Sequence, residues 1–144
     1  MTKKPAPIRD PFDPTWKVNP DTRTIAKLRD DDWPIRDIVE QRIPGTFIRR
    51  DFFNAADIVA ARPGCILAIQ ATSDTTGGNS SRRLSKCGEE PRMRTWLEAG
   101  GQFQVWAWSI RKARGEKSRV TLRRWMPLFG PVGVEWTEMP EETR

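Results

Sequence analysis

The segment AADIVAARPGCILAIQAT, at positions 55–72, decides the fold class that this sequence predicts. It contains two runs, 55–61 and 65–72, that are apolar on nearly every residue and are separated by Arg62-Pro63-Gly64. Short runs that are apolar on both faces are typical of strands covered on both sides, and Pro-Gly is a turn signal. The segment therefore predicts a hairpin of two central strands.

Upstream of this hairpin the spacing of apolar residues changes. Between Asp32 and Pro44-Gly45 they recur at helical intervals, at Ile35, Ile38, Val39 and Ile43. This spacing predicts an amphipathic helix over residues 32–43, with Asp32 as its candidate N-cap and Pro34 in its first turn. Residues 46–50 are then expected to form a short strand.

Downstream of the hairpin, residues 73–80 are rich in Thr, Gly and Asn and predict a loop. Helical spacing then continues to Gly100-Gly101, a strong stop signal. Residues 102–108 alternate between two faces and predict a strand. A basic turn over 111–117 leads to a last strand over 119–126, which we expect to pair antiparallel with it.

The order helix, three strands, helix, strand, strand predicts an α/β fold with a central mixed sheet flanked by helices. With 144 residues the chain fits one domain of ordinary size, which we place at residues 32–126. Residues 1–31 hold five prolines and no apolar period, so we expect an extended arm whose Phe12 and Trp16 dock on the body or on a partner. Residues 127–144 predict a loose tail.

The composition excludes several kinds of catalytic site. The chain contains no His and no Tyr, so His-ligated zinc, Ser/His/Asp and Cys/His pairs, and tyrosine nucleophiles are ruled out. Catalysis would have to use carboxylates, amides, hydroxyls, Lys, Arg, Cys or a metal held by oxygen ligands. No signal-peptide pattern precedes residue 20 and no apolar stretch is long enough to span a bilayer, so we expect a cytoplasmic protein without a membrane partner.

Positive charge is concentrated in one part of the chain. The net charge is +6, but residues 82–134 alone carry twelve basic and four acidic groups. A polyanion such as nucleic acid is the natural partner of such a stretch, and a solvated surface is the alternative. Trp106 and Trp108 share one strand face and are expected either to stack on bases or to pack beneath a helix offering Met93 and Trp96.

Three polar residues stand out in the central hairpin. Asp57 lies in an apolar strand, where a lone carboxylate is costly to bury unless it is paired or binds a cation. Gln70 and Thr72 fall on one face at the end of the next strand, so the three side chains are expected to converge at one sheet edge. The alternatives are an ion pair of Asp57 with Arg49 or Arg50 and a polar strand end without a ligand.

These residues resemble the motif of the PD-(D/E)xK nuclease superfamily, and most closely the Holliday-junction-resolvase-like proteins of phages and prophages. The resemblance covers residues 33–126 and rests on Glu40, on 49–53 (RRDFF), 56–60 (ADIVA), 68–73 (AIQATS), 82–86 (RRLSK) and 96–101 (WLEAGG). It implies a restriction-endonuclease-like αβββαβ core. Its motif supplies an Asp, then an acid and a Lys two residues apart, and often a glutamate on the first helix.

The resemblance assigns candidate catalytic roles to five residues. Asp57 matches the motif aspartate, Gln70 stands at the acid position, Thr72 stands at the Lys position and Glu40 matches the helical glutamate. It implies a Mg²⁺ or Mn²⁺ ion held by Asp57, Gln70 and Glu40. Since Thr72 has no charge, the missing cation is expected from Lys86, Arg82 or Arg83. The alternative for Glu40 is an exposed helical residue paired with Arg36.

The expected function is therefore that of a DNA-binding, metal-dependent endonuclease resembling Holliday junction resolvases, acting on branched or structured DNA as a homodimer. The alternative is a catalytically inactive nuclease-fold module that binds nucleic acid or a protein. The residues expected to contact DNA are basic: Arg49, Arg50, Arg82, Arg83, Lys86, Arg111, Lys112 and Arg114.

Overall fold

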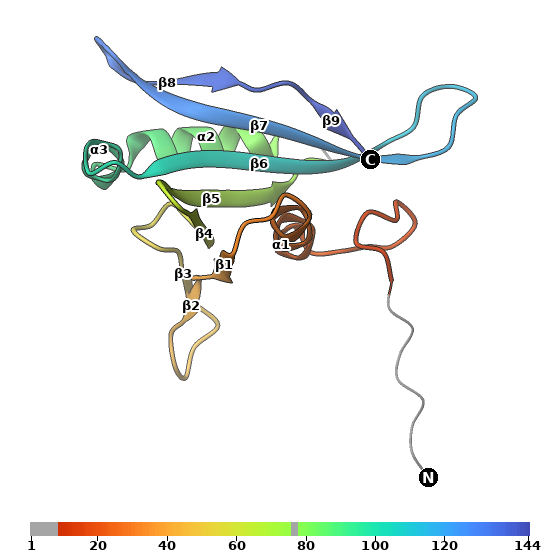
Figure 1. The fold of residues 1–144 in the computed structure, drawn as a ribbon, viewed down its shortest axis with the longest axis horizontal. Helices are drawn as coiled ribbons and strands as arrows, with labels where there is room; N and C mark the ends of the chain where they lie inside the picture. The colour runs from red at the N-terminus through yellow and green to blue at the C-terminus, as the bar shows by residue number, and fades with distance from the viewer. Residues whose placement is uncertain (1–8, 76–77) are drawn as a thin grey trace.

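The computed structural model describes residues 9–75 and 78–144 as a mixed β-sheet with helices on both faces (Figure 1). The helices are α1 (Pro20–Asp30), α2 (Asn79–Glu89) and α3 (Arg92–Glu98). The strands of the main sheet are β1 (Ile35–Ile38), β4 (Ile58–Arg62), β5 (Cys65–Ser73), β6 (Gln102–Arg111), β7 (Arg119–Gly130), β8 (Gly133–Glu138) and β9 (Glu142–Thr143). A separate ribbon pairs β2 (Gln41–Arg42) with β3 (Arg49–Arg50).

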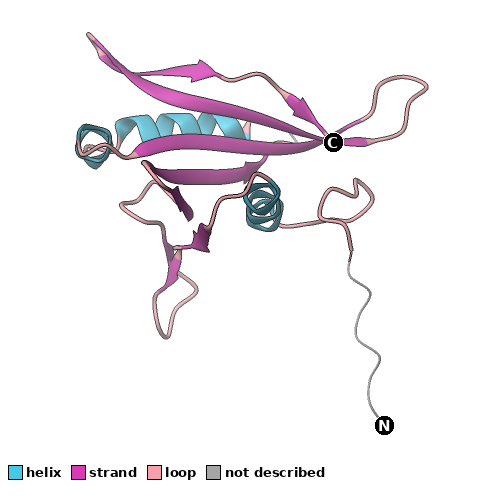
Figure 2. Cartoon of the chain, viewed as in Figure 1, coloured by secondary structure: helices cyan, strands magenta, loops and turns pink. Residues whose placement is uncertain are grey.

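The central hairpin predicted from positions 55–72 is confirmed. Strands β4 and β5 pair antiparallel from Ile58 opposite Ile69 to Arg62 opposite Cys65. Gly64 closes their turn with a φ of +79°, a left-handed conformation that glycine adopts without steric cost. The α/β class and the mixed sheet are confirmed too, because β6 runs parallel to β5 while the other neighbouring strands of the sheet are antiparallel (Figure 2).

The parallel β5–β6 pair requires a crossover connection, and α2 and α3 form it. Gly100 and Gly101 end α3 just before β6, as the sequence predicts. The basic turn and the antiparallel β6–β7 pair are confirmed as well, with Arg111 opposite Arg119. Positions 76 and 77 of the predicted 73–80 loop lie outside the described residues.

The prediction of a helix over 32–43 is wrong, because the first helix is α1, inside the segment expected to be an extended arm. Asn19 caps α1 through its side chain and Pro20 occupies its first turn. The buried face of α1 includes Arg23, Thr24 and Lys27, so an apolar period does not reveal it. Residues 1–8 of the predicted arm lie outside the described residues.

Residues 35–42 form strands instead of a helix. Ile35 and Ile38 are each 55% exposed on β1, the first strand in the sheet order, so their helical spacing does not mark a buried face. The loose tail expected over 127–144 is also wrong, since β7 extends to Gly130 and then pairs with β8 and β9.

Two apolar clusters fill the two faces of the sheet. Leu28 of α1 packs with Ile69, Trp106 and Trp108 on one face, whereas Met93 of α3 packs with Phe103 on the other. Both strand tryptophans are almost fully buried, so base stacking by them is ruled out. They lie beneath α1 and not beneath Met93 and Trp96, which was the expected alternative. Phe12 docks on the body, 5.8 Å from Trp108 between ring centroids.

No helix of the described ranges combines the length and apolar character needed to cross a membrane.

A buried hydrogen bond fixes α1 against the sheet. The Trp108 Nε1–H donates to Thr24 Oγ1 at 2.9 Å, and that hydroxyl donates to the Pro20 carbonyl at 2.8 Å. Since Thr24 and Trp108 are both almost fully buried, no solvent can replace this partner.

We expect Thr24→Val to lower the free energy of unfolding by about 1–3 kcal/mol, because valine keeps the shape but leaves the Trp108 N–H buried and unpaired. Urea denaturation followed by circular dichroism measures the loss. Thr22→Val, on the exposed side of α1, is the matched control and should change stability little. Equal stability of Thr24→Val and the native chain would contradict the anchoring role of this bond.

Candidate active site

Three carboxylates from different parts of the chain meet beside the sheet. Asp21 lies in the first turn of α1, Glu40 lies between β1 and β2, and Asp57 directly precedes β4. One oxygen of each lies within 4.8 Å of the others. Acids this close repel one another unless a proton or a cation is shared between them. This acid cluster is the strongest candidate for a functional centre in residues 9–75 and 78–144.

The backbone holds Asp57 firmly in place. Its N–H donates to the Ile69 carbonyl at 3.0 Å and its own carbonyl accepts from the Val39 N–H at 2.9 Å. These bonds extend the β1–β4–β5 pairing by one residue before the start of β4. The side chain of Asp57 is then directed into the space between the sheet and the N-terminus of α1, where its Oδ1 accepts from the Ala71 N–H at 3.0 Å.

Burial dominates the chemistry of Asp57, which is only 5% exposed. The pKa of its carboxyl is raised from the ordinary 3.8 to about 9, chiefly by loss of hydration and then by the neighbouring Asp21 carboxyl, which acts through a shared hydrogen bond and through charge. The Ala71 N–H acts in the opposite direction. Without a cation, Asp57 therefore holds a proton at neutral pH, and a bound cation would displace it.

Gln70 and Thr72 differ in their position relative to the cavity that contains Asp57. Both are buried on β5. The Gln70 side chain borders the same cavity as Asp57, and its amide nitrogen donates to Asp51 Oδ2 at 3.2 Å and to the Ala55 carbonyl at 2.9 Å in the orientation that pairs both groups. Thr72 does not line this cavity. The predicted convergence is thus found for Asp57 and Gln70, and the prediction that Thr72 joins them is wrong.

Basic side chains line the cavity together with the acids. The cavity has a volume of about 340 Å³ and is lined by residues of the acid cluster, the 51–57 segment, β5 and α2: Glu40, Arg49, Asp51, Asn54, Asp57, Gln70, Ala71, Arg83 and Lys86. A second cavity of about 260 Å³ shares Glu40 and Arg49 with it and adds Asp21 and Arg42. We call these two together the acid-cluster cavities. Positive charge beside a carboxylate group suits a phosphate ester that has to approach bound cations.

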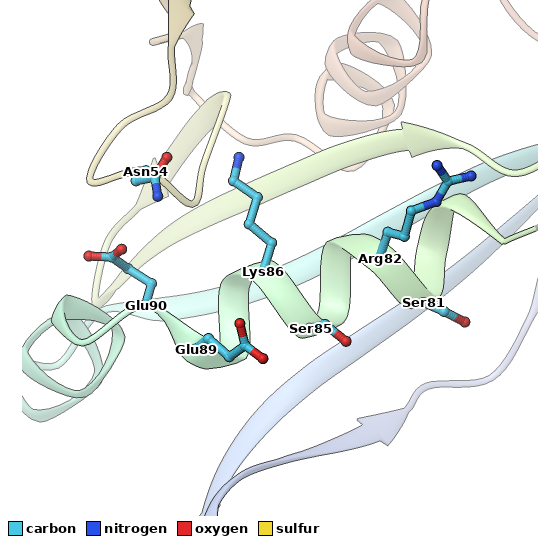
Figure 3. A pocket seen from close by; sticks show the side chains of 7 residues that line it. All are labelled: Asn54, Ser81, Arg82, Ser85, Lys86, Glu89 and Glu90. Atoms are coloured by element: carbon cyan, nitrogen blue, oxygen red, sulfur yellow. The ribbon is translucent and has the colours of Figure 1, made fainter.

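Lys86 connects α2 to this site. Its Nζ lies 3.0 Å from Asp51 Oδ2, and its side chain extends from α2 toward the loop that carries Asn54 (Figure 3). The same lysine lines a third cavity, of about 590 Å³, along the outer face of α2 with Arg82, Ser85 and Glu89. Of the three predicted cation donors, Lys86 and Arg83 line the acid-cluster cavities and Arg82 lines only the third cavity.

The alternatives that the sequence left open are decided by the ion pairs. In the described part of the chain Asp57 pairs with neither Arg49 nor Arg50, because Arg49 Nη1 lies 3.5 Å from Glu40 Oε1 instead. Glu40 does not pair with Arg36, whose Nη1 donates to the Trp33 carbonyl. Sequence reasoning missed Asp21. The signal was Asn19-Pro20-Asp21, the cap, proline and acid pattern of a helix start.

The remaining predicted DNA contacts are spread more widely than expected. Arg50 is exposed on β3, on the side of the ribbon that faces Phe52 and Phe53. Arg111, Lys112 and Arg114 are exposed in the β6–β7 turn. Arg111 and Lys112 line a cavity with the start of α2 that shares no residue with the acid-cluster cavities, so this turn does not border the same cavity as Asp57 and Gln70.

The donor set fits a hard divalent cation. Asp21, Glu40 and Asp57 offer only oxygen ligands, the kind that Mg²⁺ and Mn²⁺ prefer, and a buried carboxylate without a cationic partner has an electrostatic need for one. The Gln70 carbonyl oxygen is a neutral candidate ligand at the same cavity. Comparison of the chain with protein-family models, with curated proteins and with solved structures found no match.

We expect Asp57→Asn to raise the melting temperature in a buffer free of divalent ions. Asparagine keeps an acceptor for the Ala71 N–H but carries no charge to bury. The unfolded chain releases the Asp57 proton near its ordinary pKa of 3.8 and the folded chain near 9, so ionisation favours unfolding increasingly between these values. The gain should be near zero at pH 4 and should grow up to about pH 9.

Differential scanning fluorimetry across this pH range measures the effect. Asp37→Asn, at an exposed position on β1, is the matched control and should show no such growth. A lower melting temperature for Asp57→Asn at pH 8 would show that the carboxylate stabilises the fold and would contradict the electrostatic account of this site.

Proposed function

We propose that this protein is a metal-dependent endonuclease that hydrolyses phosphodiester bonds in DNA, resembling the Holliday-junction-resolvase-like proteins of the PD-(D/E)xK superfamily. The observation that carries the proposal is the meeting of Asp21, Glu40 and Asp57 within 4.8 Å in a basic-walled cavity. Apart from the β2–β3 ribbon and α3, the elements follow the order α1, β1, β4, β5, α2, β6, with β6 parallel to β5. This order supports the proposal because it is the αβββαβ order that the resemblance implies.

The acid cluster supplies the ligands in this proposal. Asp57 is the central one, Glu40 and Asp21 complete a set of carboxylates, and Gln70 contributes a neutral oxygen. Asp21 stands on the first helix, where the resemblance implies an acid, while Glu40 lies after β1. A bound Mg²⁺ or Mn²⁺ would supply Lewis-acid polarisation of the phosphate and activation of a water molecule.

Lys86 takes the role that Thr72 cannot fill. Thr72 lies outside the cavity, whereas Lys86 reaches it from α2 and is oriented by its ion pair with Asp51. In the proposal its ammonium group holds the scissile phosphate, with Arg83 and Arg49 on the same wall. The cation is thereby carried by the crossover helix and not by β5.

A second function is favoured by the surroundings of Gln70. This residue brings no negative charge, and its amide nitrogen is already bound by Asp51 and Ala55. The same fold without catalysis, a module that binds nucleic acid or a protein, is consistent with that arrangement. Cleavage assays with Mn²⁺ on branched DNA distinguish the two functions.

We expect Asp57→Ala to abolish Mg²⁺-dependent nicking of a four-way DNA junction while it leaves the affinity for that junction nearly intact. Binding energy comes chiefly from Lys and Arg on phosphates, and Asp57 contributes none of it. Lys86→Ala should reduce cleavage strongly, and Lys117→Ala, on the exposed β6–β7 turn, is its control. Cleavage by the Asp57→Ala protein at the native rate would end the assignment. Binding without cleavage by the native chain would favour the inactive module.

We expect the affinity for duplex DNA to fall with salt by about 0.9 in log K per log salt for each phosphate contact. Joint neutralisation of Arg111, Lys112 and Arg114 should flatten this slope by up to about three units, because the β6–β7 turn carries them on an exposed surface. Fluorescence anisotropy at several salt concentrations measures the slope. An unchanged slope would remove this turn from the DNA interface.

A further inference from the structure

The β2–β3 ribbon projects from the body of the protein beside β1 (Figure 1). Its strands pair Gln41 with Arg50 and Arg42 with Arg49, and Glu40 and Asp51 stand immediately at its two ends. The ribbon therefore begins and ends at residues that line the acid-cluster cavities. We refer to residues 41–50 as the projecting hairpin.

The tip of the projecting hairpin is ordered by its own hydrogen bonds. The Ile43 N–H donates to the Ile48 carbonyl at 2.9 Å, and the Thr46 hydroxyl donates to the Ile43 carbonyl and accepts from the Ile48 N–H. Gly45 turns the chain with a φ of +76°. Phe47 follows this turn and is 100% exposed, next to Ile48 at 60%. An aromatic ring is thus presented to solvent by a braced turn.

The charge of the projecting hairpin is entirely positive. Residues 41–50 contain three arginines and no acidic residue. Arg42 and Arg49 line the cavity that contains Asp21 and Glu40, and Arg50 lies on the opposite side of the ribbon. Within the ranges 9–75 and 78–144, Arg42 and Arg50 form no ion pair. Both guanidinium groups are therefore available to an anionic partner.

We propose that the projecting hairpin is a wedge that enters DNA, with Arg42, Arg49 and Arg50 on the phosphates and the Phe47 ring against a base step. The proposal rests on the proposed function, since it places DNA at the acid cluster. Phe47 is two residues from Arg49 in sequence, on the side of the ribbon that leads to the turn. Apolar wedges between base steps kink a duplex and favour substrates that are already unstacked.

The chemistry of the tip favours DNA over a protein partner. A stable protein interface needs about 800 Å² from each partner and an apolar centre, which a single braced turn between arginines does not offer. A DNA base step, by contrast, can accommodate a single flat ring, and the flanking cations can contact the adjacent phosphates. Branched DNA has interrupted stacking at its crossover, so a wedge adjoining the cleavage centre would select such a substrate by the lower cost of unstacking.

The test uses the full chain with Asp57→Asn, which is expected to bind DNA without cutting it. Phe47→Ala is compared with Phe47→Trp, which keeps a stacking ring, and with Val132→Ala, a 96% exposed apolar residue on the β7–β8 turn. The probe is a four-way junction of about 30 base pairs per arm pair, with 2-aminopurine beside the crossover, because this base brightens when it loses its stacking partners. Circular dichroism checks that each variant is folded.

Phe47→Ala should weaken junction binding by about five- to a hundredfold, the range for loss of one base-stacking ring, and should abolish the 2-aminopurine change. Phe47→Trp should retain binding, and Val132→Ala should match the Asp57→Asn parent. Equal affinity and fluorescence for Phe47→Ala and the parent would overturn the wedge while DNA binding, and hence the proposed function, stands. Loss of self-association without any change in DNA binding would assign the tip to contact between copies. Failure of the parent to bind the junction at all would overturn both proposals.

Discussion

The burial of Asp57 is the constraint on which the surrounding structure depends. A carboxylate that is only 5% exposed, between a sheet and a helix end, needs a proton, a hydrogen-bond donor or a cation to offset its lost hydration. The backbone bonds from Asp57 to Ile69 and from Val39 to Asp57 join β1, β4 and β5 at the level of this side chain. Asp21 and Glu40 approach from the two segments that precede the hairpin. The fold thus brings three carboxylates close together beside a buried position. That arrangement costs stability in the free protein and is typical of sites that bind a cation.

The sequence predicts well the elements whose burial pattern is simple. The β4–β5 hairpin is apolar on both faces and has a Pro-Gly turn, and β6 alternates in a regular manner, so both were found in their correct places. Asp57 and Gln70 were found for the same reason, since a polar residue in such a run is conspicuous. The α/β class followed from the order of these elements.

Where burial depends on tertiary contacts, the sequence misleads. The inner face of α1 includes Thr24, whose hydroxyl binds Trp108 across a long stretch of chain, and the aliphatic part of Lys27, whose ammonium group reaches Glu142. Neither residue contributes to an apolar period. Conversely, Ile35 and Ile38 give a helical period but are largely exposed on a short strand. Asp21 was missed with its helix. Strand β8 was missed because its residues are mostly exposed and show no buried face, and β9 because it is only two residues long.

The crossover explains how a lysine on a helix can replace one on a strand. Parallel pairing of β5 and β6 obliges α2 to run back along the sheet, antiparallel to both strands, so that its middle passes the end of β5 where Gln70 lies. A lysine side chain is long enough to reach from that helix to Asp51 at 3.0 Å, and Lys86 does so. Thr72 is only two residues from Gln70, but the rise of the strand places it further along β5, outside the cavity. The crossover therefore brings a positive charge to the cavity from α2, and in the proposed nuclease this charge makes a cationic residue at position 72 unnecessary.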